Sequence, residues 1–168
     1  MIKYRHTGIV VNNIQKSKRF YCDFLKLKVI QELEEKGDYF NQLLKSKNLK
    51  AKVIKAISED NIYVELIEFY GPKKKIKVYK KFNLVGKIHL CFTVNNINKL
   101  YIKLRKKKIT FLSKPLSSIY DKVKTCFCYD PDLNLIQFVE GENLKKKILL
   151  KKDKKILIIL IPSYEEEI

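Results

Sequence analysis

The only two histidines of the chain, His6 and His89, each stand at the head of the same short motif. The first copy reads HTGIVVNNIQK, and the second, which begins 83 residues later, reads HLCFTVNNINK. An imidazole can bind a divalent metal ion or transfer a proton near neutral pH. A lone histidine on a strand is more often structural than catalytic, so it is the repetition that points to chemistry.

Two further polar residues occupy corresponding last strands in the two halves of the chain. Glu65 lies in the run IYVELIEF, where it shares a strand face with Tyr63 and Ile67, and Gln137 lies in LNLIQFVE between apolar neighbours. Two imidazoles, a carboxylate and an amide oxygen suit a borderline divalent ion such as zinc, nickel, cobalt, manganese or iron. A carboxylate buried in an apolar strand is costly unless it is paired or metal-bound, so the presence of Glu65 in this strand needs an explanation.

Each of the four donors also has a structural interpretation. His6 and His89 can be satisfied core or surface residues, Glu65 an exposed strand position, and Gln137 a hydrogen-bond partner of nearby backbone. Taken one at a time, these interpretations are the commoner case. Their joint recurrence at matching positions of a duplication favours a shared metal site.

The elements around these residues follow the same duplication. Each motif begins with a β-branched or aromatic run of period two, and the Asn-Asn pair after it is a suitable helix N-cap. Ile97, Leu100, Tyr101 and Leu104 then recur at helical spacing, and the first-half helix begins at Ile14. Further strands are expected at 28–35, 51–58 and 61–69, and at 109–113, 122–130 and 134–140, with a short helical insert at 38–47 that could shape a pocket.

This order predicts an α+β fold of two βαβββ modules, 3–70 and 87–141, within one domain that spans 1–141. The strands are expected to form a curved mixed sheet whose concave face, turned away from the helices, holds the site. A basic connector bounded by Gly and Pro, 71–86, joins the modules. The sequence leaves open whether the site forms within one chain or by exchange across a homodimer.

The tail, 142–168, is lysine-rich and contains one short apolar run, Ile156–Ile161. This run is too short to span a bilayer as a helix, so no transmembrane segment is expected. We interpret it as an edge strand or a dimer contact, because an exposed run of this kind would aggregate. Association with a membrane surface is the weaker alternative.

The formal net charge of +18 does not indicate a specific nucleic-acid interface. Only Arg5, Arg19 and Arg105 are arginine, the lysines are spread along the whole chain, and no zinc-finger or RNA-binding motif accompanies them. The four cysteines show no zinc spacing and are expected to be reduced thiols packed as small apolar groups. The first residues lack the apolar run of a signal peptide, which predicts a cytoplasmic protein.

Several longer stretches resemble the vicinal-oxygen-chelate superfamily, which includes glyoxalase I, methylmalonyl-CoA epimerase, extradiol dioxygenases and the fosfomycin and bleomycin resistance proteins. The resemblance covers residue 3 to about 141. It is carried by RHTGIVVNNIQKSKRFYCDFLKLKVI, by VEL at Val64–Leu66, by IHLCFTVNNI and by DPDLNLIQFVE. By position, it implies His6, Glu65, His89 and Gln137 as metal ligands.

Two positions depart from the pattern of that superfamily. Leu133 replaces the glycine that usually follows Asp-Pro-Asp, and Gln137 replaces a glutamate. In glyoxalase-like and epimerase-like members this glutamate can act as the base, and in dioxygenases it completes the ligand triad. Glutamine can bind a metal through its amide oxygen but cannot accept the proton, so the catalytic base would be Glu65.

The resemblance implies a metal-dependent lyase or isomerase as the first hypothesis. In this mechanism a metal-bound carbonyl compound loses a proton to Glu65. The substrate would be a small molecule, such as a thiol hemithioacetal of glutathione or an acyl-CoA. The alternatives are a resistance-type transferase, a dioxygenase-like member, or a metal-free protein that binds a small molecule.

Overall fold

The computed structural model describes residues 1–70, 82–83, 85–119 and 122–141. Most of the expected connector and all of the expected tail therefore lie outside the described residues. Within the described part, no helix is both long and apolar enough to cross a membrane.

The first module forms a four-stranded mixed sheet with the order β1-β4-β3-β2. Its first strand is parallel to its last, and the other two ladders are antiparallel. A π-helical stretch, η1, continues directly from the first helix. The elements are β1 (Thr7–Val10), α1 (Ile14–Lys18), η1 (Arg19–Phe24), β2 (Lys28–Glu35), α2 (Asp38–Leu43), β3 (Lys50–Ile57) and β4 (Tyr63–Tyr70).

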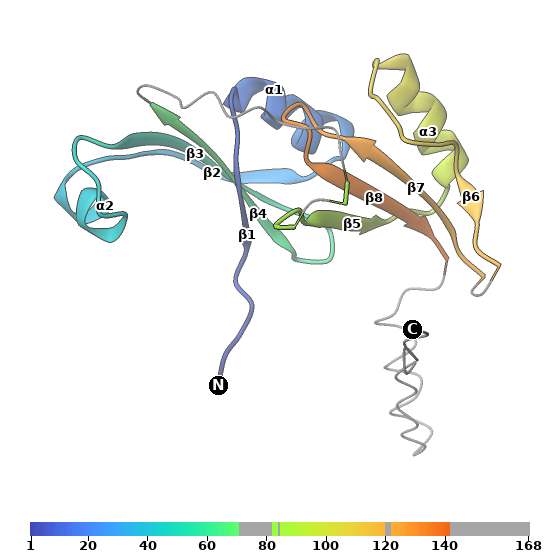
Figure 1. The fold of residues 1–168 in the computed structure, drawn as a ribbon, viewed down its shortest axis with the longest axis horizontal. Helices are drawn as coiled ribbons and strands as arrows, with labels where there is room; N and C mark the ends of the chain where they lie inside the picture. Colours follow the sequence, from blue (N-terminus) through green and yellow to red (C-terminus); the bar gives the residue numbers. More distant parts are fainter. Residues whose placement is uncertain (71–81, 84, 120–121, 142–168) are drawn as a thin grey trace.

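The second module repeats this topology with the order β5-β8-β7-β6. Its first and last strands are again parallel. The elements are β5 (His89–Thr93), α3 (Ile97–Lys106), β6 (Leu116–Ser117), β7 (Lys124–Tyr129) and β8 (Leu135–Glu140). The expected α+β fold of two related modules is confirmed, with one refinement: each module forms its own sheet rather than half of a continuous one (Figure 1).

Both helices that follow the histidine motifs are capped in the same way. Asn13 and Asn96 each accept a hydrogen bond from the backbone N–H three residues later, as their positions predict. In addition, a glutamate of the last strand accepts the first helical N–H in each module: Glu68 from Ile14 at 3.0 Å and Glu140 from Ile97 at 2.6 Å. These carboxylates fasten each helix to the strand that carries Glu65 or Gln137.

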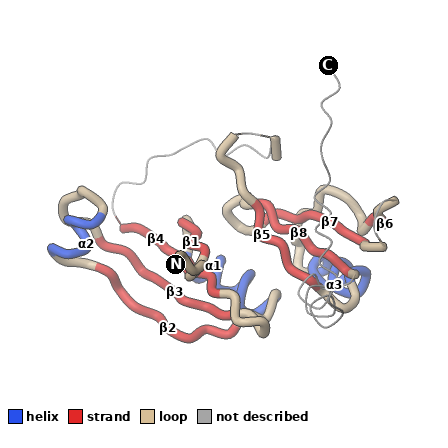
Figure 2. Tube along the Cα trace, turned by 90° about the horizontal axis from the view of Figure 1, so that it is seen from below, coloured by secondary structure: helices blue, strands red, loops and turns tan. Residues whose placement is uncertain are grey.

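Strand parity separates a core face from an open face in both sheets. Along β4, Val64 and Leu66 are buried whereas Tyr63 is exposed, and along β8 Ile136 and Phe138 are buried. The buried side chains of both modules form a single apolar core together with residues of α1, η1 and α3. Helices α1 and α3 lie on the same side of the two sheets, and the N-terminal segment leaves on the other side (Figures 1 and 2).

A polar cluster joins the first module to the turn between β7 and β8. The buried Tyr21 hydroxyl donates to Asp130 Oδ2 at 2.8 Å, and Asp130 is only 3% exposed. Asp132 of the same turn accepts bonds from Asn12 and from the Ser17 hydroxyl. Segments more than a hundred residues apart in sequence are therefore fixed side by side.

The prediction of a strand at 109–113 is wrong. Only Phe111 bridges β7, opposite Cys128, and the two-residue strand β6 follows at Leu116–Ser117. Between these two pairings the chain has two residues more than β7 opposite it, and this segment contains Pro115, which has no N–H to donate to a ladder. The helical insert expected at 38–47 is also shorter, ending at Leu43.

Candidate functional site

The strand registers place Glu65 and Gln137 at equivalent positions of the duplication. In the parallel ladder of β1 and β4, Gly8 pairs with Glu65, and in that of β5 and β8, Cys91 pairs with Gln137. Gly8 and Cys91 each lie two residues after the histidine of their module. Both polar residues are partly exposed between buried neighbours, so they lie on the face opposite the core.

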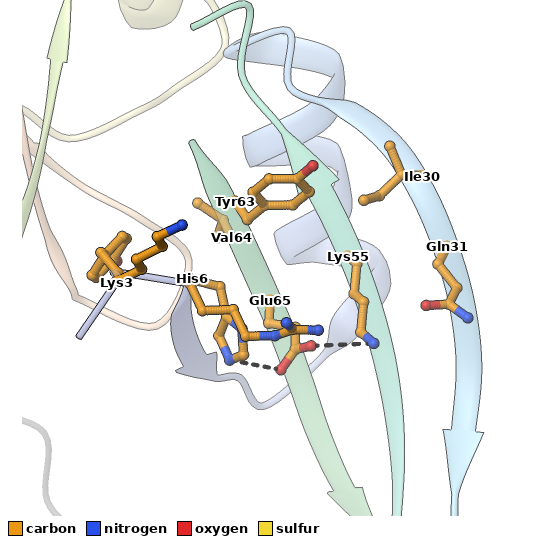
Figure 3. A pocket seen from close by; sticks show the side chains of 10 residues that line it. Lys3, His6, Ile30, Gln31, Lys55, Tyr63, Val64 and Glu65 are labelled. Atoms are coloured by element: carbon orange, nitrogen blue, oxygen red, sulfur yellow. Dashed lines mark ion pairs between the residues drawn. The ribbon is translucent and has the colours of Figure 1, made fainter. Parts of the chain in front are cut away.

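In the first module His6 and Glu65 lie together. His6 Nε2 is 3.3 Å from Glu65 Oε2, and the Glu65 side chain is only 16% exposed. The other carboxylate oxygen, Oε1, lies 3.6 Å from Lys55 Nζ on the neighbouring strand β3. Figure 3 shows the three side chains pointing toward one another from three different segments of the chain. Lys55 thus supplies part of the compensation that a largely buried carboxylate requires.

These three residues belong to the wall of a cavity of about 590 Å³. Its volume is within the range of roughly 300–1,000 Å³ that is typical of small-molecule sites. The wall combines aromatic and aliphatic groups with polar ones, and it is formed by the N-terminal segment and strands β2, β3 and β4. The lining residues are Lys3, Tyr4, Arg5, His6, Ile30, Gln31, Lys55, Tyr63, Val64 and Glu65.

The corresponding residues of the second module make different contacts. The exposed His89 packs its ring edge-to-face against Phe127, with 5.8 Å between the ring centroids. The Gln137 amide nitrogen donates to Thr125 Oγ1 at 3.1 Å. This bond uses the nitrogen of the amide, whereas a metal would bind its oxygen.

The structure therefore brings together two of the four expected ligands, His6 and Glu65. Across the described ranges, no three His, Cys, Asp or Glu side chains are grouped closely enough to hold a metal ion, so His89 does not join the first pair. By type, the donors fit a borderline divalent ion: two imidazoles, one carboxylate and one amide oxygen. The position of Glu65 between His6 and Lys55 leaves the carboxylate anchored on both sides.

The cysteines take no part in the His6–Glu65 pair. All four are free, and Cys126 and Cys128 are buried on the same face of β7, as their spacing predicts. Burial raises the pKa of Cys126 to about 11 and that of Cys128 further, so both are neutral thiols at physiological pH. Cys91 is exposed on the open face of β5, unlike the packed thiol that was expected.

Lys55 and Arg5 are functional candidates that the sequence did not single out. Lys55 is one of many lysines, and only the β3–β4 register, which pairs it with Glu65, distinguishes it. Arg5 had a signal in the sequence: it is one of three arginines, and it directly precedes His6, the first histidine of the duplicated motif.

Comparison with known proteins places the chain in a family. Residues 3–138 match the family model described as the Glyoxalase/Bleomycin resistance protein/Dioxygenase superfamily. A lactoylglutathione lyase from Schizosaccharomyces pombe (strain 972 / ATCC 24843) is 30% identical over an alignment of 152 residues, and the match covers 86% of this chain. The chain spans about half, 49%, of that relative's length.

Solved structures of low sequence identity share the fold. A glyoxalase family protein from Bacillus cereus superposes with a TM-score of 0.75 at 16% identity, covering 85% of this chain and 96% of that one. A fosfomycin resistance protein from Listeria monocytogenes, complexed with Mn(II) and sulfate ion, has a TM-score of 0.56 at 13% identity, covering 88% and 99%. The duplicated βαβββ topology and the match over residues 3–138 agree: the chain belongs to the glyoxalase/bleomycin resistance protein/dioxygenase superfamily.

Proposed function

We propose that the protein is a metal-dependent lyase or isomerase that moves a proton at a carbon next to a carbonyl group. The observation that carries this proposal is the His6–Glu65 pair, 3.3 Å apart, in the wall of a cavity of small-molecule size. A carboxylate in such a cavity is a suitable general base because it can reach a bound C–H group directly. The family match supports this class of chemistry in general terms.

In this proposal His6 and Glu65 would hold one divalent ion of the group zinc, nickel, cobalt, manganese or iron. His89 and Gln137, which the described structure keeps apart from this pair, would complete the ligand set by exchange across a homodimer. Such an ion would supply Lewis-acid stabilisation of the negative charge that develops on the substrate oxygen. Glu65 accepts the proton on a carboxylate oxygen and returns it. Lys55 and His6 fix the orientation of Glu65, and Gln137 acts only as a neutral oxygen donor because an amide cannot take up the proton.

We propose a thiol-linked carbonyl compound as the substrate, either a glutathione hemithioacetal or an acyl-CoA. The name of the Schizosaccharomyces pombe relative, lactoylglutathione lyase, favours the first. A homodimer remains an expectation from the family resemblance.

The metal part is tested by elemental analysis of untagged protein produced in metal-replete medium. One divalent ion per chain is expected, with its content reduced in His6→Ala and in His89→Ala. A protein free of metal under these conditions would contradict the proposal. It would favour the alternative, a metal-free binding protein. Two observations are in line with that alternative: Lys55 contacts Glu65, and the described ranges contain no group of three donors.

The proton-transfer part is tested with Glu65→Gln, which keeps an oxygen donor but removes the base. Solvent deuterium exchange at the substrate carbon, followed by NMR with hemithioacetal and acyl-CoA candidates, is expected to slow by about 10²- to 10⁴-fold. Glu59→Gln is the matched control because Glu59 is exposed in the turn before β4. Equal exchange rates in Glu65→Gln and Glu59→Gln would remove Glu65 from the mechanism.

A further inference from the structure

The cavity that contains Glu65 has an excess of positive charge. Three cationic side chains line it, Lys3 and Arg5 from the N-terminal segment and Lys55 from β3, against the single carboxylate of Glu65. Long basic side chains commonly extend into solvent as isolated charges. Three of them on one concave wall create a local positive potential that attracts anions.

Lys55 is the cation best placed to act on a bound molecule. It pairs with Glu65 in the antiparallel register of β3 and β4, and its ammonium lies 3.6 Å from Glu65 Oε1. Its side chain is 33% exposed, so it is partly shielded from solvent by the cavity wall. An ammonium carries three donors, and its contact with one carboxylate oxygen leaves donors for a second anion.

The second module shows that this lysine is not needed to build the sheet. There, the residue paired with Gln137 in the antiparallel register is Phe127, at the position that corresponds to Lys55. The same strand pairing therefore forms with an aromatic–amide pair in place of an ion pair. The strand pairing therefore does not require the charge at position 55, which is matched instead to Glu65 and to the cavity that both residues line.

We propose that Lys55, assisted by Arg5 and Lys3, forms an anion-binding subsite beside Glu65. The substrate class that fits is a carbonyl compound that also carries a carboxylate or phosphate group, as glutathione hemithioacetals and acyl-CoA compounds both do. The anion would bind the Lys55 ammonium, and the arginine fork of Arg5 would hold two of its oxygens. The placement of a reacting carbon next to Glu65 rests on the proposed function, but the anion subsite itself does not.

The test is binding of small anions to metal-free protein, followed by amide chemical shifts in ¹⁵N-labelled samples. The probes are inorganic phosphate, pyruvate and the uncharged analogue pyruvamide. Phosphate or pyruvate is expected to shift the amide signals of strand β4 around Glu65. Pyruvamide is expected to bind at least about tenfold more weakly than pyruvate, because it lacks the charge-assisted contact. The tighter of the two anions identifies the group that the substrate carries.

Lys55→Met is expected to weaken anion binding about tenfold or more, and Lys55→Arg is expected to retain it within a few-fold because the charge is kept. Lys50→Met is the matched control, since Lys50 is an exposed lysine at the start of the same strand and does not line the cavity. Urea unfolding of each variant distinguishes lost binding from lost folding. Anion affinity that is the same in Lys55→Met and in the wild type, or equal affinity for pyruvate and pyruvamide, would overturn the subsite.

Failure of the subsite can be told apart from failure of the proposed function. Anion binding lost in Lys55→Met, together with normal proton exchange in Glu65→Gln, would retain the subsite and reject the mechanism. The reverse result would retain Glu65 as the base and reject the subsite.

Discussion

Replacing Tyr21 by phenylalanine removes one hydroxyl from the bond that joins the first module to the β7–β8 turn. The Tyr21 hydroxyl donates to Asp130 over 2.8 Å, and both side chains are buried. A hydrogen bond to a charged acceptor contributes about 1.5–3 kcal/mol. Asp130 retains three other donors, the side chain and backbone N–H of Asn134 and the backbone N–H of Asp132. We therefore expect Tyr21→Phe to reduce the free energy of unfolding by about 1.5–2 kcal/mol, the lower end of that range.

Urea unfolding monitored by circular dichroism measures this loss. With a slope of about 1–3 kcal/mol per molar urea, the midpoint is expected to fall by about 0.5–2 M. Tyr39→Phe is the matched control because Tyr39 is 76% exposed on α2, and its effect should stay within about 0.5 kcal/mol.

A double-mutant cycle with Asp130→Asn isolates the pair itself. A coupling energy of about 1 kcal/mol or more between the two sites is expected for groups in direct contact. If Tyr21→Phe is as stable as Tyr39→Phe, or if the two substitutions are simply additive, the hydroxyl–carboxylate bond does not hold the modules together and the reasoning is refuted.

Two further predictions concern carboxylates that accept hydrogen bonds. Burial raises the pKa of Asp130 above its usual value of 3.8. Protonation of Asp130 therefore stabilises the folded state. This contribution is fully present below pH 3.8 and is lost as the pH rises through the raised pKa. The deficit of Asp130→Asn relative to wild type should therefore be larger at pH 4 than at pH 7 in urea titrations, and a deficit independent of pH would contradict the raised pKa. Because Glu68 and Glu140 accept the first N–H of α1 and α3, Glu68→Ala and Glu140→Ala should each cost about 1–2 kcal/mol of unfolding free energy, with a smaller loss for the glutamine variants. Glu59→Ala serves as the exposed control, and losses no larger than its own would show that the strand glutamates do not support the helices.

The repeated motif was enough to predict the topology and the faces of the strands. Period-two alternation and Asn caps are local signals, so the sequence correctly predicted that Glu65 and Gln137 face away from the core and that the helices begin after the Asn-Asn pairs. The paired strand positions of Glu65 and Gln137 followed from the same repeat, and the registers agree with this equivalence.

The contacts between side chains of different strands could not be predicted in this way. The partnership of Lys55 with Glu65 depends on the β3–β4 register, and that of Tyr21 with Asp130 depends on how the two modules pack. The prediction of a strand at 109–113 was wrong for a related reason. Its apolar residues are typical of a strand, but Pro115 and two extra residues interrupt the pairing with β7.

The role of Glu68 and Glu140, which accept the first helical N–H of α1 and α3, was not predicted from the sequence. Glu68 lies three residues after Glu65, and Glu140 lies three residues after Gln137, so the duplication extends to the end of both last strands. The metal site that joins His6 and Glu65 to His89 and Gln137 remains a prediction.

The unlike partners at matching strand positions have a consequence for where a molecule can bind. A protein whose two halves carried identical side chains would offer a ligand two equivalent binding positions, related by the internal symmetry. Here the first half presents an ammonium beside a carboxylate, and the second presents a phenyl ring beside a neutral amide. A charged ligand therefore has a favourable position on the open face of the first half but not on that of the second, so the two halves do not offer it equivalent binding positions.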